Sequence, residues 1–137
     1  MKPLPTLNFE FEFLTPCFSG TAEGKNAEFS ILRIPPIRGH IRMWHVSLFG
    51  AAGANTVWGS TAGDGGGSKV GVALKTNHSA SRATAEILPH KDNANHRGPR
   101  ASLPTGSRAT LIVTRLPGCT STQWDQAEKA TKLWLLL

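Results

Sequence analysis

The 137-residue sequence predicts one loop-rich α+β domain. Several short segments alternate apolar and polar residues with a period of two, as half-buried strands do, and two other stretches have helical periodicity. Fourteen glycines and nine prolines argue against a helical bundle. The length suits a single hydrophobic core, so we assign residues 1–137 to one domain.

The first predicted strand covers residues 7–13. Phe9, Phe11 and Phe13 share one face, and the residues between them are polar. A polar loop follows, and residues 29–34 form a short extended segment at most.

The clearest predicted helix spans residues 36–49, with Pro36 in the first turn, where proline is tolerated. Two stripes recur along it at helical spacing. The stripe expected to be buried consists of Ile37, Ile41, Trp44 and Leu48. The neighbouring stripe consists of Arg38, Arg42, His45 and Phe49. Gly39 costs helix propensity, which indicates a close approach by some other group or a tight packing contact.

Beyond residue 49, we expect a long glycine-rich connection over residues 50–67. Strands are predicted at residues 70–74, 84–88 and 108–115, with a polar loop over residues 89–105. A final helix then starts at Thr120 or Ser121, either of which can cap it. One face of that helix is formed by Trp124, Ala127, Thr131 and Trp134.

The predicted order is therefore strand, helix, two or three strands, helix. A ferredoxin-like (RRM-like) βαββαβ sheet needs one more strand after the last helix. We expect either that the chain is truncated or split, or that another chain completes the sheet.

The charge is unevenly distributed. Residues 1–30 carry two lysines against four glutamates, whereas the remainder carries 13 Lys and Arg against five acids. A positive surplus of this kind suits a polyanionic partner, although solubility alone explains it too. There is no secretory signal and no apolar run near the ~20 residues of a membrane span, so we expect a cytoplasmic protein without a membrane partner.

Motifs for chemistry are weak. Residues 63–69 resemble a phosphate loop only superficially, because Ser68 precedes Lys69 and a strand follows instead of a helix. Cys17 and Cys119 are too far apart for a Cys-x-x-Cys motif, and no histidines have zinc-ligand spacing, so no metal or cofactor is expected. Weak candidates for RNA cleavage remain in the loops: His90, His96, Asp64 and Asp92.

The strongest local cluster is the basic run that opens the predicted helix. Arg38 and Arg42 are one turn apart, so both guanidinium groups can reach one side. A guanidinium binds phosphate through two parallel hydrogen bonds, and free amides at a helix start add attraction for anions.

Together with its flanks, this run resembles the N-terminal signature of the CRISPR-associated RAMP superfamily, most closely the N-terminal domain of subunit one of the type III-B Cmr effector complex. The similarity covers roughly residues 7–75, and the rest only by strand order. The matching segments are residues 14–20, Glu28, residues 34–44, residues 58–60 and residues 67–70. His45 stands where the family usually has a second tryptophan.

The resemblance implies a ferredoxin-like RAMP domain that assembles with other RAMP subunits around guide (CRISPR) RNA and target RNA in a prokaryotic antiviral complex. In that family this subunit lies near the 3′ end of the guide and is not the nuclease. Arg38, Arg42, Arg33 and His40 would then face RNA. The full set expected to bind RNA is Arg33, Arg38, Gly39, His40, Arg42, His45, Lys69, Lys91, Arg97 and Arg100.

The sequence departs from the family in lacking the glycine-rich, arginine-containing loop after the final helix and the second RAMP domain. Our expectation is a non-catalytic RNA-binding subunit. The alternatives are an endoribonuclease of the same superfamily, cutting target RNA or processing guide RNA, and a scaffold whose basic surface binds acidic proteins.

Overall fold

The computed structural model describes residues 1–19, 29–62, 66–76, 81–86 and 99–136. It combines helices with a small antiparallel sheet, as the predicted α+β class requires. In chain order they are β1 (Thr6–Glu12), α1 (Ile34–Phe49), α2 (Ala51–Trp58), β2 (Val70–Thr76), β3 (Thr84–Glu86), β4 (Pro99–Ala101), β5 (Arg108–Arg115) and α3 (Ser121–Leu136). Among the described residues, no helix is long and apolar enough to cross a membrane.

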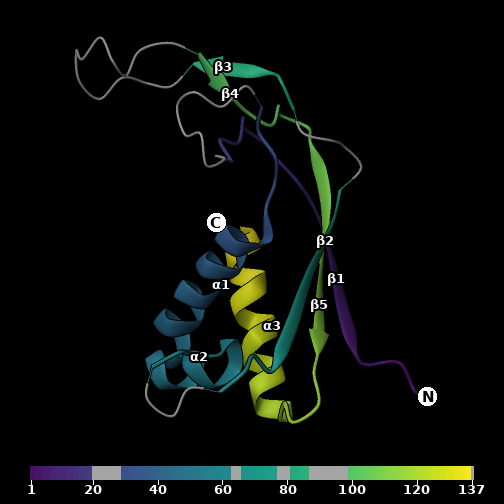
Figure 1. Ribbon diagram of the computed structural model, residues 1–137, viewed down its shortest axis with the longest axis vertical. Helices are drawn as coiled ribbons and strands as arrows, with labels where there is room; N and C mark the ends of the chain where they lie inside the picture. The colour runs from purple at the N-terminus through teal and green to yellow at the C-terminus, as the bar shows by residue number, and fades with distance from the viewer. Residues whose placement is uncertain (20–28, 63–65, 77–80, 87–98, 137) are drawn as a thin grey trace. The chain divides into compact units, whose positions relative to one another are not determined.

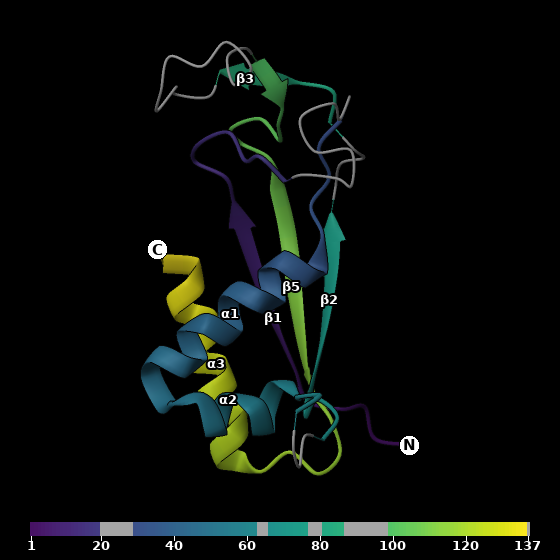
Figure 2. The same cartoon turned by 60° about the vertical axis from the view of Figure 1, so that its left-hand side comes forward.

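The chain divides into two units. The first comprises residues 1–9, 34–75 and 110–137, and the second residues 10–33 and 76–109. The first unit contains the three helices and most of a three-stranded antiparallel sheet with the order β1-β5-β2. In both ribbon views the three helices lie on the same side of this sheet, and β5 runs opposite to its two neighbours (Figure 1, Figure 2).

Strands β1 and β5 follow their predicted patterns closely. β1 alternates exposed and half-buried residues along its whole length, with Phe9 and Phe11 on the half-buried side. β5 has the predicted bounds, and Ala109, Leu111 and Val113 are buried at every second position. A strand with period-two burial presents one apolar face to the core, which here lies under the helices.

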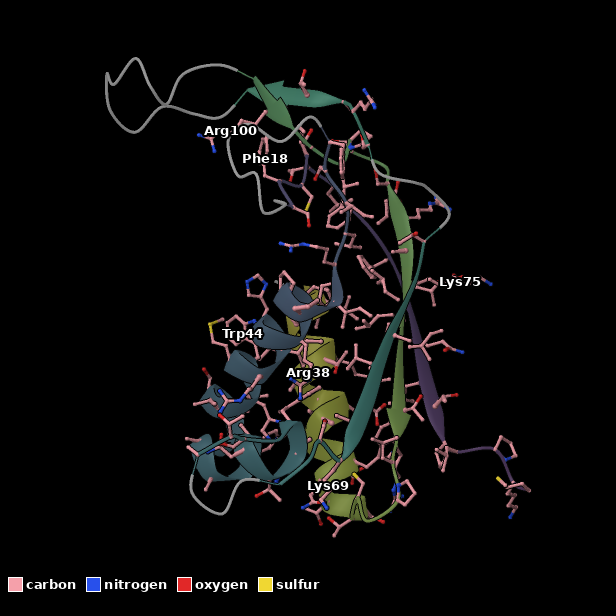
Figure 3. All side chains as sticks on the ribbon, viewed as in Figure 1. Phe18, Arg38, Trp44, Lys69, Lys75 and Arg100 are labelled. Carbon is pink, nitrogen blue, oxygen red and sulfur yellow. The ribbon has the colours of Figure 1, made fainter. Side chains whose placement is uncertain are left out.

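The predicted buried stripe of α1 is wrong in its second half. Ile37 and Ile41 are buried, but the third buried residue is His45, whereas Leu48 is 45% exposed and Trp44 is half-buried. Figure 3 places Trp44 on the side of α1 away from the sheet. The reason is α2, which begins only two residues after α1 ends and packs against the His45 side.

Helix α2 occupies the part of the chain for which we predicted a glycine-rich connection. It buries Ala54, Val57 and Trp58, a spacing of three and four residues that gives a short helix one apolar edge. Glycines at both ends delimit it, Gly50 and Gly59, and each has a positive φ. Such backbone angles suit glycine because a Cβ would be strained there.

The final helix is confirmed, and Thr120 is its cap. The Gln123 amide N–H donates to the Thr120 hydroxyl oxygen at 3.1 Å, and the Thr120 amide N–H donates to the Gln123 side-chain oxygen at 2.9 Å. This reciprocal pair is a capping box. Ala127, Ala130 and Thr131 are buried where α3 packs on α1, and their small side chains permit a close approach.

The second unit is built from short pairings. β3 and β4 form an antiparallel pair that aligns Ala85 with Arg100. Isolated bridges join Cys17 to Leu103 and Ser30 to Ser81. The extended segment predicted at residues 29–34 is reduced to the single bridge at Ser30. The strand predicted at residues 84–88 is present over residues 84–86, and its end lies outside the described residues.

Candidate functional site

In the first unit, a hollow of about 470 Å³ lies between α1, the end of α2 and the loop that leads to β2. We call it the arginine hollow. Its walls are formed by Arg38, Arg42, Trp58, Gly59, Ser60, Thr61, Gly66 and Ser68. The two arginines come from one side of α1, because residues four apart lie one helical turn from each other.

Helix α2 holds both guanidinium groups in place. Nη2 of Arg38 donates to the main-chain carbonyl of Trp58, and Nη2 of Arg42 donates to Oδ1 of Asn55. The Trp58 carbonyl is in the last turn of α2, where carbonyls lack helical partners and the helix dipole attracts cations. Arg38 also lies 6.0 Å from the centre of the Trp58 ring.

These contacts leave most of each guanidinium's five N–H donors available. Within the described residues, no carboxylate pairs with either arginine. Residues 29–62, which include α1 and α2, contain no Asp or Glu. The two positive charges are therefore fixed in position but not neutralised, which is an arrangement suited to an anionic ligand.

His45 lies beneath this site and is completely buried. Its Nδ1 accepts a hydrogen bond of 3.0 Å from the Trp58 indole N–H. Because Nδ1 accepts, the proton of the neutral imidazole is on Nε2, which makes no hydrogen bond of good geometry within the described residues. The prediction that His45 contacts RNA is therefore corrected: its side chain is inaccessible, and it anchors Trp58 instead.

The surroundings of His45 favour the neutral imidazole. Burial lowers its pKa below the usual 6.5, and the charge of Arg42 lowers it further, while the nearby Gln126 side chain partly opposes the shift. A protonated ring would also turn an N–H toward the Trp58 N–H and break the bond between them. The hydrogen bond between Trp58 of α2 and His45 of α1 thus requires a neutral imidazole.

Stability is expected to fall as the pH drops below about 6.5, because the unfolded chain binds a proton at His45 that the folded chain resists. This stabilisation is fully present above the pKa of His45 in the unfolded chain. It is lost as the pH falls toward the lower pKa of His45 in the folded protein. Urea denaturation of the parent and of His45→Gln between pH 5 and 8 measures this. If the stability of His45→Gln depended on pH as the parent's does, this prediction would be contradicted. The control is His40→Gln, at an exposed position, which should keep the parent's pH dependence.

Gly59 closes the loop that faces the arginines. Its φ is +83°, and a Cβ built there would lie 3.0 Å from the Gly66 carbonyl oxygen and 3.1 Å from the Ser68 amide. Two main-chain hydrogen bonds close the base of this loop. The Ser60 N–H donates to the Gly66 carbonyl at 3.2 Å, and the Lys69 N–H donates to the Val57 carbonyl at 2.8 Å. Only glycine permits this close approach of backbone to backbone.

Gly59→Ala is expected to destabilise the protein by about 1–3 kcal/mol, because it combines a positive φ with a backbone collision. Gly39→Ala is the matched control. Apart from its chain neighbours and its own helix backbone, no atom of the described residues lies within 4 Å of a Cβ at residue 39, which is exposed on α1. Alanine should therefore stabilise by up to about 1 kcal/mol. Thermal melts of the two variants should move in opposite directions, and equal shifts would contradict this account.

A second hollow of about 410 Å³ adjoins the first, since Ser60 and Gly66 belong to the walls of both. We call it the hydroxyl hollow. Its walls are formed by Asn55, Thr56, Ser60, Ala62, Gly66, Gly67 and Lys69. Lys69 comes just before β2, and Figure 3 shows it at the end of the unit where α2 lies.

The structure brings together three of the predicted site residues, Arg38, Arg42 and Lys69, around these two hollows. Gly39 and His40 are exposed on α1 but line neither hollow. The packing explanation for Gly39 is excluded within the described residues, since nothing approaches it. Arg33 and Arg100 belong to the second unit, and Lys91 and Arg97 lie outside the described residues.

Sequence reasoning missed Asn55 and Thr56, because it missed α2. The pattern Ala54, Val57, Trp58 followed by Gly59 was the available signal, as three apolar residues at helical spacing before a C-terminal glycine indicate a short helix. The weak cleavage candidates cannot be placed: His90, His96, Asp64 and Asp92 lie outside the described residues. In the part of the chain that is described, no group of three His, Cys, Asp or Glu side chains could hold a metal.

The chain matches no protein-family model, and no curated protein matches it significantly.

Proposed function

We propose that this protein is an RNA-binding α+β module whose arginine hollow holds the sugar–phosphate backbone. The observation that carries this proposal is the pair of braced guanidinium groups of Arg38 and Arg42, which line one hollow without a described carboxylate partner. The outer side of β1 is a poorer candidate, since Glu10 and Glu12 are exposed there.

More particularly, we propose a non-catalytic subunit of a type III CRISPR effector complex, of the RAMP superfamily and most like the N-terminal domain of subunit one of the Cmr complex. Support comes from two segments that resemble separate family motifs. Residues 34–44 contribute Arg38 and Arg42, and residues 58–60 contribute the opposite wall. Segments over ten residues apart in sequence thus meet around one site.

The proposed fold is ferredoxin-like without its last strand. The order β1-β5-β2, with helices on one face, is the order that such a sheet has when the strand beside β1 is left out. The proposed partners are guide RNA, target RNA and other RAMP subunits, in the cytoplasm of a prokaryote, with no cofactor.

Binding to single-stranded RNA is expected to weaken steeply as salt rises, because each neutralised phosphate contributes about −0.7 to the slope of log K against log salt. Fluorescence anisotropy with a labelled oligonucleotide measures the slope, and gel analysis of the same samples detects cleavage. A flat salt response would contradict the proposal and favour a protein-binding scaffold. Cleaved RNA that persists in highly purified samples would favour the endoribonuclease.

A further inference from the structure

Chemically, the hydroxyl hollow differs from the arginine hollow beside it. Among the described residues that line it, the only cationic side chain is Lys69, and the other polar side chains are Asn55, Thr56 and Ser60. No aromatic side chain lines it among the described residues, so it offers no surface for stacking a base. Walls that are polar but mostly uncharged suit a sugar better than a phosphate or a base.

The unused hydrogen-bonding groups in this hollow can be counted. Ser60 Oγ accepts from the Ala62 N–H at 3.1 Å, which leaves its own hydrogen available as a donor. Thr56 Oγ1 donates to the Ala52 carbonyl at 3.0 Å, which leaves its lone pairs available as acceptors. The Asn55 oxygen is occupied by Arg42, which leaves the amide NH₂ as a donor.

A donor and an acceptor in the walls of one hollow match a group that both donates and accepts, and the ribose 2′-hydroxyl is such a group. The ribose of a nucleotide is bonded to its phosphate. A phosphate in the arginine hollow therefore puts its ribose next to Ser60, which both hollows share.

We propose that the hydroxyl hollow binds the ribose of single-stranded RNA and distinguishes RNA from DNA through the 2′-hydroxyl, with Ser60 as donor and Thr56 as acceptor. This inference rests on the proposed function, since the adjoining arginine hollow must hold the phosphate. Lys69 adds a positive charge to the same hollow and is expected to act on RNA and DNA alike.

The test compares the Kd of one single-stranded sequence as RNA and as DNA at the same salt concentration. The parent is expected to bind RNA about five- to thirtyfold more tightly, the range for one or two net hydrogen bonds. Ser60→Ala and Thr56→Val should each lower this ratio toward one by weakening RNA binding far more than DNA binding. Ser47→Ala, an exposed hydroxyl on α1 that donates to the Met43 carbonyl, is the matched control and should leave the ratio unchanged.

The outcomes separate the two proposals. Equal, salt-dependent binding of RNA and DNA by the parent overturns the ribose inference and leaves the phosphate site standing. A preference for RNA that survives in both variants also overturns it. Failure to bind either nucleic acid overturns the proposed function and the ribose inference with it.

Discussion

The double variant Arg38→Ala/Arg42→Ala is expected to bind single-stranded RNA about a hundredfold more weakly than the parent. A hydrogen bond to a charged group contributes about 1.5–3 kcal/mol, and 1.4 kcal/mol is a factor of ten in Kd. Two such contacts, each counted at the lower limit, give the hundredfold loss. The salt slope should also become shallower by about 1.4, because two fewer phosphates are neutralised.

Two further variants separate a loss of specific contacts from other causes. Lys129→Ala/Lys132→Ala removes the same net charge from α3, which lines neither hollow, and should weaken binding far less. Arg38→Lys/Arg42→Lys keeps the charge but loses the planar fork, so it should have intermediate affinity. Because both arginines also brace α2, circular dichroism must first establish that each variant is folded. A folded alanine double variant with parental affinity contradicts the site.

Trp58→Ala is expected to lower the free energy of unfolding by about 3–5 kcal/mol, which is a large part of the 5–15 kcal/mol typical of a domain. The Trp58 side chain is 1% exposed, so its removal leaves a cavity at the junction of α1 and α2. It also deprives His45 Nδ1 of its donor.

Trp44→Ala is the matched control, because Trp44 lies on the same pair of helices but is half-buried. Trp44→Ala should lower the free energy of unfolding by clearly less than Trp58→Ala does. Trp58→Phe keeps an aromatic ring but loses the N–H, so it should fall between the parent and Trp58→Ala. Guanidinium chloride unfolding followed by far-UV circular dichroism gives all three values. Equal losses at Trp58 and Trp44 would contradict the assignment of Trp58 as the anchor.

Elements with strong periodicity could be predicted from sequence. β5 was predicted with its observed bounds, and the capped final helix was predicted because Thr120 and the residues after it have both capping and helical signals. Arg38 and Arg42 were predicted as one cluster because i, i+4 spacing fixes their common side on any helix. These features depend on local sequence alone.

The features that failed depend on tertiary contacts. The buried stripe of α1 turns toward His45 because α2 packs there, and α2 itself was obscured by glycines at both of its ends. The polar ring of His45 suggested exposure, but the indole N–H of Trp58 satisfies one nitrogen and makes burial tolerable. No pattern within α1 alone contains this information, since the partner is thirteen residues away on another helix.

The account's central claim is that RNA lies in the arginine hollow, and chemical-shift mapping tests it most directly. We predict that titration of the ¹⁵N-labelled protein with a short single-stranded RNA shifts the Arg38 and Arg42 side-chain signals. The backbone amides of Ser60, Gly66 and Ser68 should shift with them. Saturable shifts confined to other residues, with these five signals unmoved, would contradict it.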